Sequence, residues 1–404
     1  MLNKNNQREL AYVVRITKIE PIYGSDNCEA AYVNGWHVMV KKGAFNAGDL
    51  AVYFEIDSKV DVTLPEFSFL ESRKGKIKTQ RYTFGGKGNF ISQGLLMSFD
   101  DFGWAADRYS EGEFLTKKLG VIYADDEDNF RKAPSSNKYR SMQDRHKRLF
   151  KSKFGKWMME RFWGREVMFL FFGKKKDRKT DWPAWVEKTD EERVQNMPWL
   201  FPSCSTEWIA TEKIDGTSTT FTMRNDSKKE LLVCSRNVVF DSPKKEDINY
   251  YKDSDGNVYT EMANKHNVAC IMRQMISDFE NENGKKLKFL TIQGETYGGN
   301  IQKRNYGPEH RLKVFNIIYG LETTSVRLNP IQGKTVAEKY GLDYVPIVAE
   351  HVKLPSTCDE VVAMAHGASL VDGQLREGLV FRSYDGQQSF KAVDPEFLIK
   401  YHSK

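Results

Sequence analysis

Residues 207–216 have the sequence EWIATEKIDG, in which a strand-like run of apolar residues ends at a lysine, an acid and a glycine. A lysine beside a carboxylate at the end of a strand is usually a solvent-exposed ion pair. Lys213 and Asp215 therefore indicate little by themselves, and their meaning depends on the motifs that follow them along the chain.

Further short motifs follow in order, each inside or at the end of another strand-like run. Alone, each of them is more often structural than functional. The ordered set is a stronger signal, because it supplies a lysine, acids, an aromatic residue and a second lysine in succession. The motifs are SRN (235–237), GETYG (294–298), KVFNII (313–318), EGLVFR (377–382) and SFKAV (389–393).

In this order the motifs resemble those of covalent nucleotidyltransferases, and most closely those of ATP-dependent RNA ligases of the Naegleria type. The resemblance covers residues 182–404 and implies an α+β nucleotidyltransferase domain with antiparallel sheets. It also implies an OB-fold domain, a small β-barrel, ahead of that domain. The stretch KTDEERVQN (188–196) and the N-terminal sequence are similar to the same family.

The resemblance implies a reaction in successive nucleotidyl transfers. Lys213 displaces pyrophosphate from ATP and becomes joined to AMP, AMP then passes to an RNA 5′-phosphate to give AppRNA, and a 3′-hydroxyl finally displaces AMP. Lys391 is implied to neutralise charge on the α-phosphate. The family's last motif often has a second lysine two residues later, but this chain has Val393 there and its next cation is Lys400.

The attacking amine must lose its proton, and an unperturbed lysine has a pKa of about 10.4. Nearby cations lower that pKa. The resemblance implies that Asp215, Glu295 and Glu377 surround a divalent metal, Mn²⁺ or Mg²⁺, and carboxylate oxygens are the ligands that such ions prefer. Asp26, in the turn YGSDN (23–27), is the candidate acid for a second metal on the β- and γ-phosphates, with ordinary turn chemistry as its alternative role.

The same resemblance implies a set of residues that bind the nucleotide, and Glu295 is one of them. Phe315 would stack on adenine, and Glu212 would bind the exocyclic amine of the base. Arg236 would hold the ribose or the RNA 5′-phosphate, for which a planar bidentate donor is suited. Arg193 would clamp the γ-phosphate, and its alternative is a helical i,i+4 ion pair with a neighbouring acid.

Residues 1–121 are predicted to form the OB-fold domain. Segments rich in Val, Ile, Tyr and Phe alternate there with turns that carry Gly, Asn and Asp. Closely spaced strands with glycine turns favour a small barrel. The segments are AYVVRITKIEPI (11–22), EAAYVNGWHVMV (29–40) and DLAVYFEID (49–57).

Residues 122–181 differ from both flanking regions. A polar stretch at 125–140 indicates a linker, and residues 145–179 interleave Lys and Arg with Phe, Trp and Met. Amphipathic helices that bury their aromatic side explain this pattern. The functional alternative is a basic surface, including Lys174 to Lys176, that contacts RNA.

In residues 182–404, strands and helices alternate without a βαβ period, which is typical of an α+β domain. The predicted helices are 265–282 and 336–340. The predicted strands are 207–216, 218–224, 230–237, 288–298, 312–320, 378–384 and 388–393.

The composition is that of a globular protein of 404 residues, and the formal net charge of +6 permits a nucleic-acid partner. The five cysteines are scattered and form no CxxC pair, which argues against a zinc site or a disulfide framework and favours a reducing, cytoplasmic location, in the host cell if the protein is viral. The N-terminus lacks the apolar core of a signal peptide, and no run is long enough to cross a membrane. We expect a monomer with no membrane partner.

Capping guanylyltransferases share the lysine motif, but they place an OB-fold domain after the last motif, where this chain has only a short tail. DNA ligases normally have the same trailing domain, and a DNA ligase stays an alternative. A non-catalytic nucleic-acid-binding protein with an inactive nucleotide pocket is the alternative from another class. Such a protein would be free to lose Lys213 or the acids, and all of them are present.

Overall fold

The structure, a computed structural model, divides into two compact units. The first consists of Met1–Ile56, Ile77–Leu119 and Thr180–Lys404, and the second of Asp57–Lys76 and Gly120–Lys179. The residues that the structure describes are 1–3, 7–86, 88–124, 146–160, 167–168, 171–172, 182–201, 206–226, 228–240, 257–299, 301–302 and 304–402.

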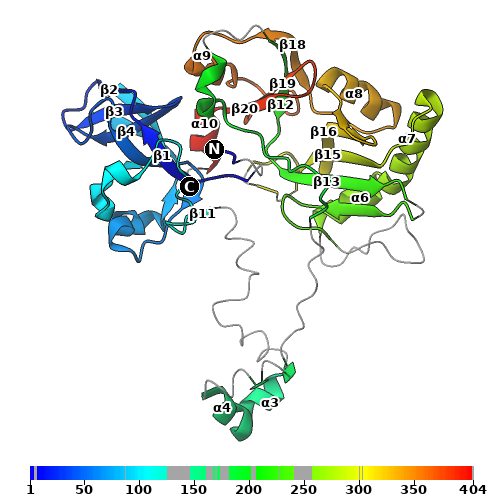
Figure 1. Ribbon diagram of the computed structural model, residues 1–404, viewed down its shortest axis with the longest axis horizontal. Helices are drawn as coiled ribbons and strands as arrows, with labels where there is room; N and C mark the ends of the chain where they lie inside the picture. Colours follow the sequence, from blue (N-terminus) through cyan, green and yellow to red (C-terminus); the bar gives the residue numbers. More distant parts are fainter. Residues whose placement is uncertain are drawn as a thin grey trace. The chain divides into compact units, whose positions relative to one another are not determined.

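The N-terminal part of the first unit is built from short antiparallel strands (Figure 1). β5 pairs with β1 and β10, β3 pairs with β2 and β4, and β8 pairs with β9. Alternate apolar residues point into one core, in which the rings of Tyr12, Trp36 and Tyr53 are in contact. The strands are β1 (Ala11–Arg15), β2 (Lys18–Pro21), β3 (Cys28–Val33), β4 (Trp36–Lys41), β5 (Leu50–Phe54), β8 (Thr79–Phe84), β9 (Gly88–Gln93) and β10 (Leu95–Met97), with short 3-10 turns η2 (Asp100–Phe102) and η3 (Ala106–Arg108) after them.

The C-terminal part of the first unit contains two antiparallel sheets. One has the order β14-β13-β15-β16-β17, and the other has the order β18-β12-β19-β20. The strands are β12 (Glu207–Lys213), β13 (Thr217–Arg224), β14 (Leu231–Cys234), β15 (Phe289–Tyr297), β16 (Arg311–Gly320), β17 (Ser325–Arg327), β18 (Ile347–Lys353), β19 (Gly378–Ser383) and β20 (Ser389–Val393). The helices are α6 (Val258–Lys265), α7 (Val268–Asn283), α8 (Pro330–Lys339), α9 (Cys358–Met364) and α10 (Pro395–Phe397), with η4 (Val194–Asn196), η5 (Pro198–Leu200) and η6 (Leu398–His402).

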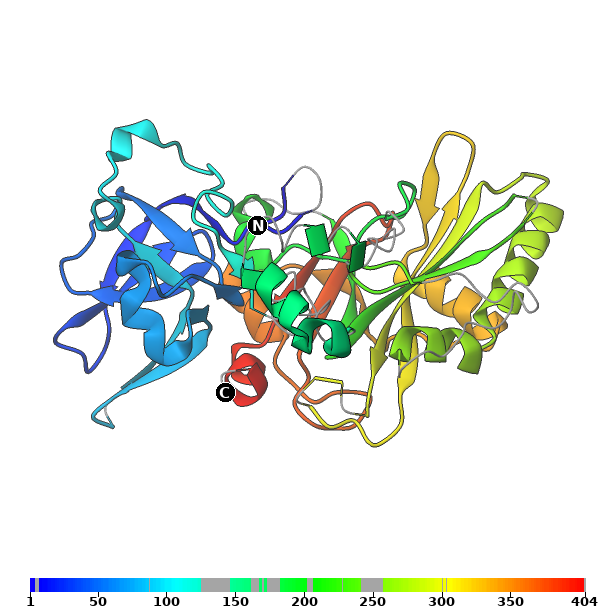
Figure 2. The ribbon, with the colours of Figure 1, turned by 90° about the horizontal axis from the view of Figure 1, so that it is seen from below.

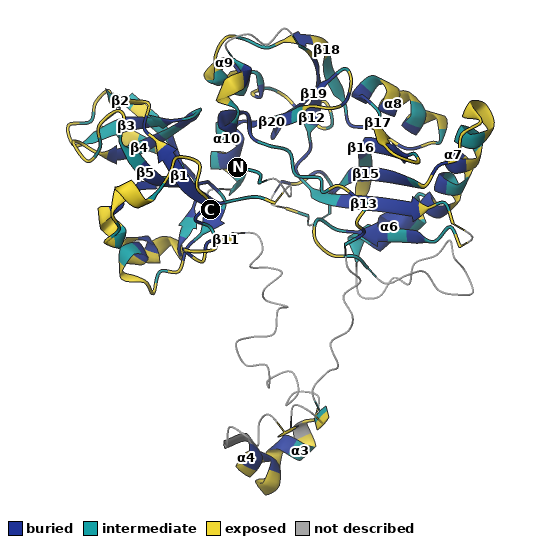
Figure 3. Cartoon of the chain, in the orientation of Figure 1, coloured by how far each residue is buried: buried dark blue, intermediate teal, exposed yellow. Residues whose placement is uncertain are grey.

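Each sheet has one apolar and one polar face. In the five-stranded sheet, apolar side chains such as Phe221 and Leu290 pack on α6, α7 and α8, which cover one face (Figure 2). In the four-stranded sheet, Trp208 and Phe381 pack with residues of α9. Central strands such as β13 and β15 are largely buried, whereas the outer sides of α7 and α8 are exposed (Figure 3). Alternation along the strands therefore directs the remaining, largely polar side chains to the opposite faces.

The second unit contains the strands β6 (Ser58–Lys59) and β11 (Ile122–Tyr123), the 3-10 helix η1 (Pro65–Arg73), and the helices α3 (Lys147–Lys151) and α4 (Lys153–Glu160). The strand β7 (Lys76–Ile77) begins in this unit and ends with the first residue of the next segment of the first unit. Phe150, Met158 and Met168 form a small apolar cluster, whereas Trp157 is 43% exposed. Helices are thus confirmed in the basic, aromatic segment. The predicted RNA-contact residues Lys174 to Lys176 lie outside the described residues.

Each predicted strand of residues 182–404 corresponds to an observed strand, although β12 already ends at Lys213 and β14 at Cys234. The strands β17 and β18 were not predicted, and the helices differ in extent. The helix predicted at 265–282 is α7, and a separate α6 precedes it. The helix predicted at 336–340 is the end of α8, which begins at Pro330 because Asn329 and Gln332 form a capping box. The boundaries 1–121, 122–181 and 182–404 stay predictions. In the described part of the chain, no helix is long and apolar enough to span a membrane.

Candidate active site

Lys213 is the last residue of β12 and pairs with Gly378 of β19. The chain then turns through Asp215 and Gly216 into β13. A Cβ atom on Gly216 would lie 2.4 Å from the carbonyl oxygen of Thr296 and 2.9 Å from Cγ of Glu295. The glycine therefore lets the turn that follows the lysine pack directly on β15, beside the Glu295 side chain.

Both carboxylate oxygens of Glu377 contact the lysine amine, with Nζ–Oε1 and Nζ–Oε2 distances of 2.7 and 2.8 Å. Burial by itself lowers the pKa of Lys213, but the charges of Glu377, Glu295 and Asp215 together raise it above its ordinary value. In this state the amine is held as an ammonium ion. It becomes a nucleophile only when its proton is removed.

The acids around the lysine are crowded. Burial, together with the charges of Glu377 and Asp215, raises the pKa of Glu295 to about 8 although Lys213 opposes the shift. Burial, followed by the charge of Asp215, also raises the pKa of Glu377. Oδ2 of Asp215 is buried, and among the described residues it accepts no hydrogen bond. This acid cluster (Asp215, Glu295 and Glu377) is short of positive charge.

The donor chemistry of the acid cluster fits a hydrated divalent cation, because its oxygen atoms are hard ligands with an unmet need for a cation. Over the described ranges, no three His, Cys, Asp or Glu side chains converge closely enough to hold a metal directly. Asp26 is exposed in the turn between β2 and β3, and its predicted role stays a prediction.

Lys391 lies on β20, opposite Val380 of β19. Its backbone N–H donates to the carbonyl oxygen of Glu192 at 2.7 Å. Burial, followed by the charge of Arg8, lowers the pKa of Lys391 well below its ordinary value; Arg193 and Lys213 add to this effect, and Asp190 opposes it. A phosphate at this place would relieve the repulsion among these cations.

Arg193 is 6% exposed and precedes the 3-10 helix η4 in an extended conformation. It forms a parallel bridge with Lys391, and its guanidinium carbon lies 5.8 Å from the centre of the Trp36 ring. The alternative of a helical i,i+4 pair is therefore wrong, because the residue is not in an α-helix. The bridge places the backbone of Arg193 next to that of Lys391.

Arg236 follows β14 and binds Asp190, with an Nη2–Oδ2 distance of 2.5 Å. Burial alone would raise the pKa of Asp190, but Lys391 and Arg236 lower it well below its usual range. Sequence reasoning singled out Arg236 and missed Asp190. The signal was available, because Asp190 belongs to the KTDEERVQN stretch that also contains Arg193.

The predicted adenine-binding residues come from different elements. Phe315 lies at a bulge where β16 is out of step with β15, and it is half-buried. A bulge redirects the side chain of the extra residue, so the bulge in β16 can turn the Phe315 ring toward a ligand. Glu212 is buried, its Oε2 accepts the backbone N–H of Leu370 at 2.7 Å, and its Oε1 accepts the Ser369 hydroxyl. Neither Ser369 nor Leu370 was predicted from the sequence.

A loop after β15 holds the lysine turn from the other side. The Tyr306 hydroxyl accepts the N–H of Asp215 at 3.3 Å, and Nε2 of Gln302 donates to the carbonyl oxygen of Gly216 at 3.1 Å. Arg304, between them in sequence, is buried and forms an ion pair with Asp372. The loop has no periodic pattern, so nothing in the sequence marked these residues.

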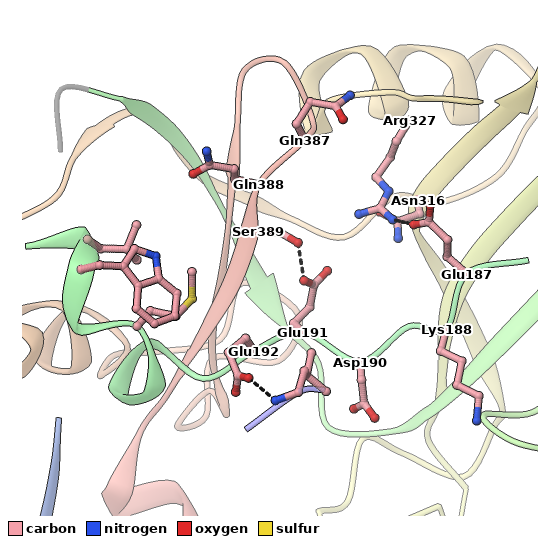
Figure 4. A pocket seen from close by; sticks show the side chains of 14 residues that line it. Glu187, Lys188, Asp190, Glu191, Glu192, Asn316, Arg327, Gln387, Gln388 and Ser389 are labelled. Carbon is pink, nitrogen blue, oxygen red and sulfur yellow. Dashed lines mark hydrogen bonds and ion pairs between the residues drawn. The ribbon is translucent and has the colours of Figure 1, made fainter. Parts of the chain in front are cut away.

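Residues 187–196, which we call the strap, connect the two sheets. Gln293 of β15 donates to the carbonyl oxygen of Glu187 at 2.8 Å, and Arg382 of β19 binds Glu191 at 2.8 Å. A pocket of about 490 Å³ lies beside the strap, and in Figure 4 Ser389 and Glu191 point toward each other within it. Lys213 does not line this pocket. The lining includes Glu187, Lys188, Asp190, Glu191, Glu192, Asn316, Arg327, Gln387, Gln388 and Ser389.

Comparison with known proteins adds to this geometry. Residues 206–402 match a family model described as RNA ligase, and residues 10–98 match one described as an OB-fold domain. The predictions of an OB-fold domain and of a nucleotidyltransferase domain with antiparallel sheets are thereby confirmed. No curated protein matches the chain.

Solved structures of the Naegleria gruberi RNA ligase are similar to the chain over 98% of its length, and the chain covers 100% of theirs. The structure with pyrophosphate is 26% identical, with a TM-score of 0.68. A mutant with ATP and manganese is 24% identical with a TM-score of 0.70, and a mutant with AMP and manganese is 24% identical with a TM-score of 0.66.

Proposed function

Residues 206–402 belong to the RNA ligase family, whose members are ATP-dependent ligases, and we propose that this protein joins RNA 3′-hydroxyl and 5′-phosphate ends through a covalent Lys213–AMP intermediate. The observation that carries the proposal is the amine at the end of β12. It contacts Glu377 at 2.7 and 2.8 Å and is surrounded by the acids Asp215 and Glu295.

In the first step the lysine ammonium loses its proton. Glu377 is in direct contact with the amine and has a raised pKa, so it is placed to take that proton. The nitrogen of Lys213 then bonds to the α-phosphorus of ATP, the bond from that phosphorus to the bridging oxygen breaks, and pyrophosphate leaves. Lys391 and Arg193 would supply positive charge for the phosphates once ATP is bound, because the phosphates favour the ammonium form of Lys391.

A divalent cation held through water by the acid cluster would lower the pKa of the amine and neutralise charge on the α-phosphate. The chemistry of the carboxylates supports this role, as does the presence of manganese in the similar Naegleria gruberi structures. Mn²⁺ and Mg²⁺ both suit oxygen ligands of this kind.

The nucleotide and the RNA would be bound by side chains near the lysine. Phe315 would stack on adenine, and Glu212 would accept a hydrogen bond from the base. Arg236, now paired with Asp190, would exchange that carboxylate for the 5′-phosphate of RNA. AMP would pass to this phosphate, and attack by the 3′-hydroxyl of the other end would release AMP and complete the phosphodiester.

The proposal is tested by incubating the protein with α-³²P-ATP and Mn²⁺ or Mg²⁺, and then measuring label on the denatured chain. Wild type should carry label that is acid-labile and alkali-stable, and Lys213→Ala should carry none. Lys288→Ala is the matched control, because Lys288 is 55% exposed in an ion pair with Glu322. Absence of label on wild type would favour a non-catalytic binding protein.

The choice between RNA and DNA is tested with matched nicked duplexes that differ only in the sugar of the 3′-hydroxyl strand. A preference for a ribose end supports the RNA ligase, because the 2′-hydroxyl is the group that distinguishes the two strands. Equal or better sealing of a deoxyribose end would favour the DNA ligase instead.

A further inference from the structure

A buried polar network joins the OB-fold domain to the strap. Its first centre is Glu55, which follows β5 and has a side chain only 1% exposed. The Glu55 carboxylate is 3.1 Å from Nη1 of Arg8, 3.0 Å from the hydroxyl of Tyr12 and 2.7 Å from Nδ2 of Asn196. Arg8 and Tyr12 belong to the N-terminal part of the chain, and Asn196 ends the strap.

Asn196 is the second centre of the network and is fully buried. Its Oδ1 accepts from Nε1 of Trp36 at 2.7 Å and lies 3.0 Å from the Tyr12 hydroxyl. Its Nδ2 donates to Glu55 and, at 2.8 Å, to Oε1 of Glu192. One amide therefore uses both of its N–H groups and its carbonyl oxygen, and no smaller side chain can reproduce this set of contacts.

The network also fixes Arg193. The backbone N–H of Asn196 donates to the carbonyl oxygen of Arg193 at 2.9 Å, so the two residues form the single turn of η4. Trp36, which donates to the Asn196 side chain, also lies against the Arg193 guanidinium. The backbone of Arg193 is bridged to Lys391 on its other side. A change at Asn196 would therefore move Arg193 relative to Lys391.

We infer that Asn196 and Tyr12 are positioning residues, which act through Arg193 to align the phosphates of ATP for attack by Lys213. The inference rests on the proposed function. It assigns to the contact between the OB-fold domain and the strap a role in lysine adenylylation. A shift of about 1 Å in such a group is enough to cost about 100-fold in rate.

The test compares Asn196→Ala, and the milder Tyr12→Phe, in two assays. The first is the rate at which Lys213 is labelled by α-³²P-ATP. The second is the sealing of RNA that is already adenylylated, assayed without ATP, which requires no alignment of pyrophosphate. We expect adenylylation to fall by about 10- to 100-fold for Asn196→Ala and less for Tyr12→Phe. Sealing of AppRNA should stay within about 2-fold of wild type, because its transition state involves no triphosphate.

Arg15→Ala is the matched control on the same domain, since Arg15 forms an exposed ion pair with Glu111 and should behave as wild type in both assays. A parallel loss of both activities would overturn the inference, because it would indicate a general structural role. Wild-type rates in both variants would overturn it as well. Absence of label on wild type would instead reject the proposed function itself.

The adenylylation rate of a double variant gives a second test, which distinguishes action through Arg193 from a general structural role. If Asn196 acts through Arg193, then Asn196→Ala should cost little further adenylylation in an Arg193→Ala background. Additive losses would show that Asn196 acts by another route and would contradict the inference.

Discussion

The molecule contains two clusters of buried charge that are built in opposite ways. Around Glu55, hydrogen bonds and cations meet the carboxylate from several sides. Burial alone would raise its pKa, but the amino terminus, Arg8 and Arg193 lower the pKa of Glu55 to about 2. Around Lys213 the acids outnumber the cations, and burial raises the pKa of Glu295 to about 8. Asp215 keeps a buried oxygen atom that accepts no hydrogen bond in the described part of the chain.

The difference distinguishes a cluster that stabilises the fold from a cluster that binds a ligand. A buried carboxylate is tolerated when cations and donors offset its desolvation, as they do at Glu55. A cluster that lacks such partners costs stability, and such clusters are typical of sites that a ligand completes. The acid cluster would be completed by a metal cation, and Lys391 by a phosphate anion.

The largest effect is expected at Lys391, whose positive charge is opposed by those of Arg8, Arg193 and Lys213. Lys391→Ala should lower the rate of lysine adenylylation by about 100- to 1000-fold, the cost of removing one preorganised charge from a transition state. Because burial disfavours the ammonium form of this residue, the thermal stability should not fall. Single-turnover labelling and thermal unfolding measure the two effects, with Lys288→Ala as the control. A large loss of stability with an unchanged rate would show that Lys391 is structural.

A smaller effect is expected at Glu55, in the well-paired network. Glu55→Gln should destabilise the protein by about 3 kcal/mol at pH 7, because Arg8 loses its buried partner. The native pKa is below the ordinary value, so the carboxylate's contribution is present above pH 4.5 and is lost as the pH falls through about 2. The difference between variant and wild type in denaturant unfolding should therefore shrink in acid.

Glu111→Gln is the control for this measurement, because Glu111 is 52% exposed in its ion pair with Arg15. It should change stability by about 0.5 kcal/mol or less. An equal effect of the two substitutions would contradict the contrast between the buried network and an ordinary surface pair.

The last effect is expected at Glu295 and has the opposite sign. Its native pKa is raised to about 8, so the native state holds a proton that the unfolded state releases above about pH 4.5. Stability is therefore lost as the pH rises through about 8, and Glu295→Gln removes that loss. In metal-free buffer the variant should match wild type near pH 4.5 and become progressively more stable than wild type as the pH rises from there to 8.5. A destabilised variant at pH 8.5 would show that the cluster is not short of positive charge.

The order of the motifs along the sequence was enough to predict the fold and to select residues that the structure brings together. Lys213 and Glu377 are in contact, and Glu295 and Asp215 act on both electrostatically. Lys213, Asp215 and Glu377 lie at strand ends or in the turn beside a glycine, and Glu295 follows Gly294 within β15, so turn chemistry and strand alternation predict where these side chains point.

Other parts of the site could not be predicted, because they depend on pairings between distant residues. Nothing in the local pattern around Asn196 indicates that its amide binds Glu55, 141 positions earlier. Ser369 and Leu370 bind Glu212 from an irregular loop. The helix α9 was missed even though Thr357 and Glu360 form a capping box at its start. The capping box was visible in the sequence, but a helix of only seven residues has too little periodic pattern to be predicted from it.

The central claim is that Lys213 carries AMP. The most direct measurement is peptide mass spectrometry of the wild-type protein after reaction with ATP and Mn²⁺, with the mass of AMP mapped to a residue. We predict that the modification lies on the peptide that contains Lys213 and is absent when ATP is omitted. AMP on another residue, such as Lys391, or an unmodified chain that has nevertheless sealed RNA, would contradict the account.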